Sequence, residues 1–96
     1  MHDPGAAPIA VAGLSHHTAH VTDLETFRFP DEAAFLSHAA ERFKGVLLLQ
    51  TCNRVEVIVQ GDSTALADYL VGQGKSGFFL LEGTDALTHL FELASG

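Results

Sequence analysis

The segment LLLQTCNRVEVIVQ, residues 47–60, contains two apolar runs separated by a short polar break. The first run belongs to the continuous apolar sequence VLLLQ, which is typical of a strand buried on both faces or nearly so. In the second run valines recur at every other position, which also predicts a strand. The break TCN is short enough for a hairpin, and Asn53 tolerates the left-handed backbone that such turns often need. The sequence therefore predicts a β-hairpin over residues 46–60.

On the N-terminal side of the hairpin, the sequence predicts one strand and one helix. The run PIAVAGL, residues 8–14, is typical of a short strand, and the polar segment after it is expected to be loop with a helical turn near residues 24–27. Pro30 followed by two acids predicts the start of a helix, since proline suits a first turn and acids suit the positive end of the helix dipole. This helix is expected to end at Gly45. Its apolar face consists of Phe35, Leu36, Ala39 and Phe43.

On the C-terminal side, the sequence predicts a helix, a strand and a final helix. Residues 61–63, Gly-Asp-Ser, end the hairpin strand and cap a helix that carries Leu66, Tyr69 and Leu70. A glycine-rich turn then leads to the strand candidate FFLLEG, residues 78–83. Thr84 and Asp85 are expected to cap the last helix. The apolar face of that helix is expected to consist of Leu87, Leu90, Phe91 and Ala94.

The resulting order is β-α-β-β-α-β followed by a terminal helix. This order is typical of an α+β fold of the ferredoxin-like, split βαβ type. Such a fold has an antiparallel four-stranded sheet with two helices on one face, to which this chain adds a C-terminal helix. Residues 1–7 are expected to be a loose leader, and residues 8–96 a single domain.

Composition and charge limit the functions that the chain can have. Its 96 residues are 47% hydrophobic, which indicates a packed core and not a disordered segment. The net charge of −7, from five Lys and Arg against twelve Asp and Glu, argues against a phosphate-binding surface on this chain alone. One cysteine cannot form an internal disulfide, no signal peptide is expected, and no apolar run reaches the roughly 18–20 residues of a membrane span. We therefore expect a cytoplasmic protein that does not cross a membrane.

The single cysteine lies at the predicted hairpin tip. Arg54, two residues on, supplies a positive charge, and a nearby cation favours the thiolate that acts as a nucleophile. Thr51 and Asn53 bring hydroxyl and amide donors to the same tip, where they suit a substrate or a developing oxyanion. The alternative is that Cys52 is a small, half-buried residue at a strand end, since most buried cysteines behave as small hydrophobes.

The six histidines allow two further interpretations. His16, His17 and His20 cluster after the first strand and offer a metal site together with Cys52, but their spacing matches no strong metal motif, so no metal site is expected. His89 borders the apolar face of the last helix. It is either a hydrogen-bonded boundary residue or a general base directed at the sheet. No glycine-rich phosphate loop is present.

Three motifs together resemble the N-terminal catalytic domain of the glutamyl-tRNA reductase family. They are GLSHHTA at residues 13–19, TCNRVE at residues 51–56 and LTHLFELASG at residues 87–96. The resemblance covers the chain from about Ile9 onward. It implies an oxidoreductase that uses NADPH to reduce the glutamyl group of glutamyl-tRNA(Glu) to glutamate-1-semialdehyde in tetrapyrrole (porphyrin, haem) biosynthesis.

The resemblance also implies roles for individual residues. Cys52 matches the family's nucleophile, which holds the glutamyl group as a thioester. Arg54 matches the residue that recognises the substrate carboxylate, and Thr51 and Asn53 line the same site. His89 matches a proposed general base. The other side of the pocket corresponds to Ser15, His16 and Thr18. The sequence departs from the family at Gln50, where serine is usual, and at His17, where lysine is usual.

The resemblance further implies that the chain is truncated. The family's enzymes continue with an NADPH-binding domain and a helical dimerisation domain, form homodimers, and hand their product to glutamate-1-semialdehyde aminomutase. We therefore expect this chain to carry out the thioester step and to lack the reductase step. The alternative is a non-catalytic ferredoxin-like module for binding or metal sensing. Fast alkylation of Cys52 favours the enzyme, and metal analysis of the purified chain tests the alternative.

Overall fold

The computed structural model describes residues 8–95, so the predicted leader at residues 1–7 lies outside the described part. The elements are β1 (Ile9–Ser15), α1 (Val21–Phe27), α2 (Glu32–Ala39), β2 (Val46–Gln50), β3 (Arg54–Gln60), α3 (Ser63–Gly72), β4 (Phe79–Glu82) and α4 (Thr84–Ser95). The four strands form one sheet in the order β2-β3-β1-β4, and every neighbouring pair is antiparallel. This is the strand order of the ferredoxin-like fold, so the predicted fold class is confirmed.

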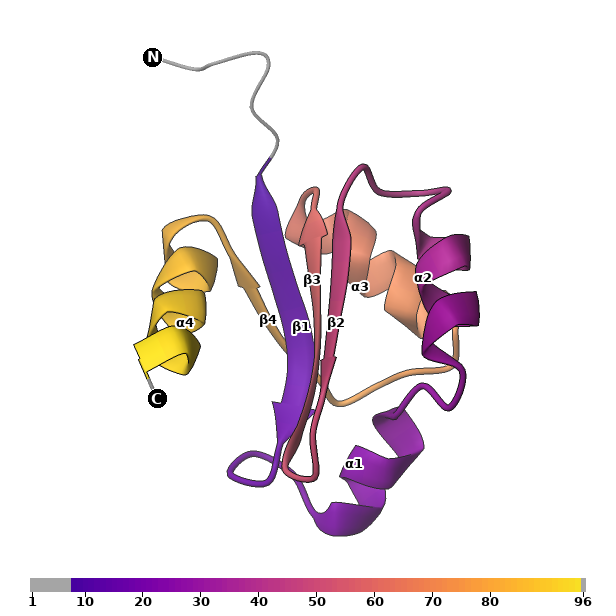
Figure 1. Cartoon of the computed structure of the whole chain (residues 1–96), viewed down its shortest axis with the longest axis vertical. Helices are drawn as coiled ribbons and strands as arrows, with labels where there is room; N and C mark the ends of the chain where they lie inside the picture. Colours follow the sequence, from indigo (N-terminus) through magenta and orange to yellow (C-terminus); the bar gives the residue numbers. More distant parts are fainter. Residues whose placement is uncertain (1–7, 96) are drawn as a thin grey trace.

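The sheet has helices on both faces. Figure 1 shows α2 and α3 on one side of the strands and α4 on the other. Residues of α1, α2 and α3 share a core with the inward side chains of β1 and β3, whereas Ala86 of α4 packs against Val11 and Ile58 on the opposite face. Two aspartates cap the N-termini of helices on the first face. Asp31 accepts a hydrogen bond from Ala34 N at the start of α2, and Asp62 accepts one from Ala65 N at the start of α3.

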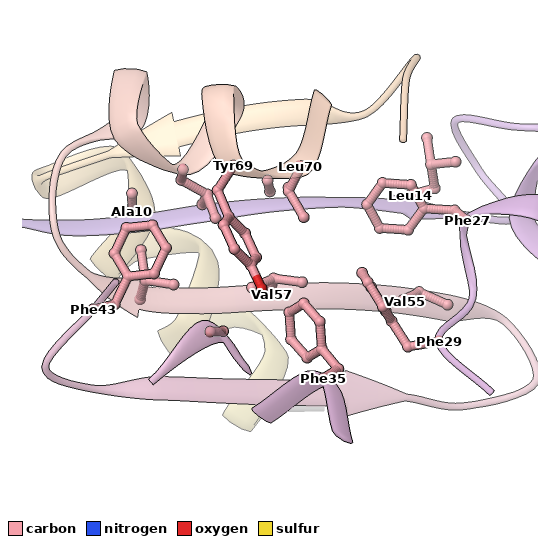
Figure 2. Close-up of a cluster of buried hydrophobic side chains, with 14 of the residues drawn as sticks. Ala10, Leu14, Phe27, Phe29, Phe35, Phe43, Val55, Val57, Tyr69 and Leu70 are labelled. Atoms are coloured by element: carbon pink, nitrogen blue, oxygen red, sulfur yellow. The ribbon is translucent and has the colours of Figure 1, made fainter. Parts of the chain in front are cut away.

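The larger core lies under α1–α3 and depends on the alternation in β3. Val55, Val57 and Val59 point into it and are at most 1% exposed, as their period of two predicted. Aromatic rings fill the space between these valines and the helices (Figure 2). The ring centroids of Phe29 and Phe35 are 4.0 Å apart, and those of Phe43 and Tyr69 are 5.7 Å apart. This packing holds the β2–β3 hairpin against the helices.

Two helix predictions near the N-terminus are wrong in extent. The helical turn expected near residues 24–27 is part of the longer helix α1, which begins at Val21, while the residues before it form a turn. Helix α2 ends at Ala39 and not at Gly45. Phe43 is nevertheless buried, because the irregular segment after α2 folds back onto Tyr69. Burial of the aromatic ring therefore does not require the helix to continue.

The prediction that β2 is buried on both faces is also wrong. The strand lies at the edge of the sheet, and Leu47 is 67% exposed. Helix α4 packs on β4 and β1, at the other side of the sheet, and leaves the outer face of β2 open. A continuous apolar run is compatible with either position, because its pattern does not show which strands flank it.

The predicted buried face of α4 is wrong by about one residue. Leu87 and Phe91 are 45% and 71% exposed, whereas Ala86 is fully buried and Leu90 packs beside it. Ala94 is also exposed. The helix begins one residue earlier than expected, because Gly83 O accepts the first helical hydrogen bond, from Leu87 N. Thr84 and Asp85 therefore lie in the first turn and do not precede it.

Candidate active site

The predicted hairpin tip is confirmed, and Cys52 is exposed on it. Thr51 N donates to Arg54 O at 2.9 Å, and Asn53 N donates to the Thr51 hydroxyl at 3.3 Å. Among the described residues only glycines have a positive φ, so the tip closes without the left-handed Asn53 that the sequence suggested. The exposed thiol contradicts the interpretation of Cys52 as a half-buried residue.

A second tight turn, at the end of β1, lies against the hairpin tip. Ser15 N donates to the Thr18 hydroxyl at 3.1 Å, and that hydroxyl lies 3.2 Å from Ser15 O, to which it donates in turn. His16 N donates to Asn53 O at 2.8 Å and thereby ties the two turns together. The side chain of His16 is exposed and its ring lies 3.8 Å from that of His17. The two motifs that are far apart in sequence thus meet at one end of the sheet.

A buried carboxylate connects β3 with α4 next to this tip. Glu56 is fully buried on the α4 face of the sheet. Arg54 Nη1 donates to its Oε2 at 2.6 Å, and His89 Nε2 lies 2.7 Å from its Oε1. With the Glu56 carboxylate as the acceptor, His89 Nε2 is assigned as the donor of this contact. Both carboxylate oxygens therefore have a partner, as a buried charge requires.

Space for the Glu56 side chain comes from Gly13, its partner across the β1–β3 ladder. A Cβ on Gly13 would lie 2.3 Å from Val55 O and 2.9 Å from Glu56 Cγ, so no larger residue fits without moving β3. The edge of the Phe79 ring packs on His89, with centroids 5.3 Å apart. Gly13 and Phe79 therefore pack directly against the carboxylate stem and the imidazole.

No group of three His, Cys, Asp or Glu side chains within residues 8–95 is arranged to hold a metal ion. None of the described helices has the length and apolar character needed to cross a membrane.

Comparison with known proteins gives this geometry a context. Residues 12–96 match the family model described as the N-terminal domain of glutamyl-tRNA(Glu) reductase. The chain belongs to this family. A glutamyl-tRNA reductase from Methanoregula boonei is 66% identical over 87 residues, which are 91% of this chain and 20% of that protein. One from Deinococcus radiodurans is 35% identical over an alignment of 102 positions, which covers 100% of this chain and 29% of that protein.

A solved structure gives the same result for the fold. The structure of glutamyl-tRNA reductase from Methanopyrus kandleri superimposes with a TM-score of 0.76 at 33% identity, over 92% of this chain and 22% of that one. The chain thus spans about a fifth of the length of the first relatives that it matches. These matches show the fold and the family of this chain.

The structure gathers the predicted site residues at one end of the sheet. Ser15, His16 and Thr18 form the turn after β1, and the hairpin tip beside it carries Thr51, Cys52, Asn53 and Arg54. His89 joins this group through Glu56 and makes no hydrogen bond to Cys52 in the described part of the chain.

Sequence reasoning did not indicate two residues that contact the predicted site residues, Glu56 and Arg28. Glu56 stands in the sequence RVEVIVQ, where a single acid interrupts a strand of Val and Ile. A buried acid in such a strand needs a charged or hydrogen-bonding partner, so the position of Glu56 in the sequence could have indicated a buried polar contact. Arg28 donates to the hairpin tip from 23 residues away, and no local pattern indicates that contact.

Proposed function

We propose that this domain performs the acyl-transfer step of a glutamyl-tRNA reductase. The observation that carries the proposal is an exposed thiol at a hydrogen-bonded tip, two residues before the Arg54–Glu56–His89 network. In this step the Cys52 sulfur attacks the carbonyl carbon of the ester between glutamate and the tRNA ribose. A C–S bond forms, the C–O bond breaks, and the ribose oxygen leaves with a proton. The product on the protein is a glutamyl thioester.

Arg54 is proposed to bind the side-chain carboxylate of the glutamyl group. Its Nη1 is used by Glu56, and within the described residues Nη2 and Nε make no hydrogen bond. Two donors on one rigid fork are therefore available for a substrate carboxylate, which suits bidentate recognition. The buried Glu56 carboxylate fixes the plane of the guanidinium and balances its charge. Thr51 and Asn53 at the tip, with Ser15, His16 and Thr18 opposite, complete the proposed pocket.

His89 is proposed as the group that moves the proton. Because Nε2 is bonded to Glu56, the nitrogen that accepts or returns a proton is Nδ1. This is the arrangement in which a carboxylate orients an imidazole and stabilises its charged form.

The residues present do not fit NADPH. A dinucleotide fold needs parallel βαβ units with a glycine-rich turn at a helix N-terminus, whereas every strand pair described here is antiparallel. We derive no reductive step from this domain. For the complete enzyme we propose, on the family resemblance, a cytoplasmic homodimer that binds NADPH in a later domain and passes its product to the aminomutase.

The test is mass spectrometry of the chain after mixing with glutamyl-tRNA. We expect a glutamyl adduct on Cys52, slow release of glutamate, and no semialdehyde with or without NADPH. The matched control is Cys52→Ser, which should form no adduct. An adduct on another residue, or NADPH-dependent semialdehyde from these 96 residues alone, contradicts the proposal. The same comparison in the full-length enzyme covers the case in which the remaining domains are needed to hold the tRNA.

A further inference from the structure

The Arg28 side chain, just after α1, donates hydrogen bonds to the backbone of the hairpin tip that carries the Cys52 thiol. Arg28 Nη2 donates to Thr51 O at 2.5 Å and to Cys52 O at 3.1 Å. These two carbonyls belong to the exposed turn, whose other backbone bonds are Thr51 N to Arg54 O and His16 N to Asn53 O. One side chain therefore satisfies two consecutive acceptors at the residue proposed as the nucleophile.

Arg28 also makes contacts outside the hairpin. Its Nε donates to Glu25 Oε1 at 2.9 Å, one turn back in α1. Its carbonyl oxygen accepts a hydrogen bond from Lys75 Nζ at 3.0 Å, and the same ammonium lies 4.5 Å from the centre of the Phe29 ring. Arg28 is only 22% exposed. Glu25 thus orients the guanidinium from outside the hairpin, and Lys75 ties the Arg28 backbone to the α3–β4 loop.

Gln50 makes a parallel connection one residue before Thr51. Its Oε1 accepts from Phe29 N at 2.8 Å, and its Nε2 donates to Phe29 O at 3.0 Å and to Glu32 Oε2 at 2.7 Å. The amide therefore pairs with both backbone groups of Phe29, as a neighbouring strand would. The serine that is usual in the family at this position is two carbons shorter and has no second polar atom for this pairing.

We propose that Arg28 is a positioning residue for Cys52 and that, with Gln50, it forms a bracket holding the hairpin tip in the geometry for attack. The proposal rests on the proposed function, since it assumes that Cys52 is the nucleophile. Arg28 approaches from the side of α1, whereas Arg54 and Glu56 act on the side of α4. Loss of Arg28 therefore changes the position of the Cys52 sulfur and leaves Arg54 able to bind the substrate carboxylate.

The expected effect follows from the sensitivity of attack to position. A misplacement of about 1 Å costs on the order of 100-fold in rate. For Arg28→Gln in the full-length enzyme we expect kcat to fall about 10- to 100-fold while KM for glutamyl-tRNA changes less than about twofold. Arg28→Lys keeps the charge and one donor nitrogen, and it should recover part of kcat. Gln50→Ser should show a smaller loss of the same kind.

The structural part of the bracket is tested independently by amide hydrogen exchange. In Arg28→Gln, exchange at Thr51 N, which bonds Arg54 O, should accelerate about tenfold, and exchange in the β1–β3 ladder should not change. The matched control is Arg42→Gln, which removes an arginine that stacks over Tyr69 away from the tip. It should leave kcat and the exchange of Thr51 unchanged.

Each result decides between the alternatives. If Thr51 N exchanges in Arg28→Gln at the same rate as in the parent protein, the proposed bracket is wrong. Accelerated exchange with parental kcat, or a loss of kcat/KM that lies entirely in KM, overturns the positioning role. Parental activity of Cys52→Ser overturns the proposed function instead, and the exchange result for the bracket is unaffected by it.

Discussion

Gly13→Ala is expected to damage the fold and the site together. Gly13 lies in the centre of β1, opposite Glu56, and its φ is not positive, so an alanine is excluded there by contact and not by backbone strain. The added Cβ would lie 2.3 Å from Val55 O, whereas real contacts of this kind are at least 3.0 Å. The two central strands must therefore separate locally by 0.7 Å or more.

The cost of this separation can be bounded. Overpacking of a well-packed interior typically costs about 1–3 kcal/mol, and the upper end applies because the opposing atoms are backbone and the rigid Glu56 stem. At about 4–8 °C per kcal/mol for a domain of this size, a loss of about 3 kcal/mol lowers Tm by about 12–24 °C. Displacing Glu56 also disturbs its bonds to Arg54 and His89, so adduct formation at Cys52 should fall in the protein that stays folded.

Thermal and urea unfolding followed by circular dichroism measure the effect. The matched control is Gly72→Ala at the end of α3, where an added Cβ meets nothing within 4 Å. This control should raise stability by about 0.5 kcal/mol, since alanine loses less entropy than glycine on forming a helix. If Gly13→Ala is as stable as the parent, the close β1–β3 approach and the tight packing of Glu56 on Gly13 are refuted.

Three further changes test the site and the core. Cys52→Ser should unfold within about 0.5 kcal/mol of the parent, because the thiol is exposed, yet form no glutamyl adduct; an adduct on the variant would contradict the nucleophile assignment. Arg54→Lys should cost about 1.5–3 kcal/mol in discrimination between glutamyl- and glutaminyl-tRNA in the full-length enzyme, and equal discrimination would count against its role. Tyr69→Phe should change the pH dependence of urea unfolding. Burial raises the pKa of Tyr69 above 10.0, so the associated stability is present below pH 10.0 and is lost as the pH rises through the folded-state pKa. The variant should lack this loss, and identical profiles for both proteins would show that the phenol does not titrate differently on folding.

Local features of this protein were readable from its sequence because their causes are local. The alternation of valines in β3 follows from the period of a strand, and the caps at Asp31 and Asp62 follow from unpaired N–H groups in a first turn. The polar break at residues 51–53 predicted the tip that exposes Cys52. The order of strands and helices was sufficient for the fold class, because few antiparallel topologies accommodate it.

Features that depend on packing between distant elements were decided only by the tertiary structure. The apolar pattern of α4 is compatible with several rotations of the helix about its own axis. The observed rotation buries Ala86 and pairs His89 with Glu56, and it leaves Phe91 exposed. The contact between Arg28 and the hairpin tip likewise joins residues 23 and 24 positions apart. Sequence periodicity describes which residues share a face of one element. Which element that face packs against depends on the free energy of the whole folded chain, which no single element determines.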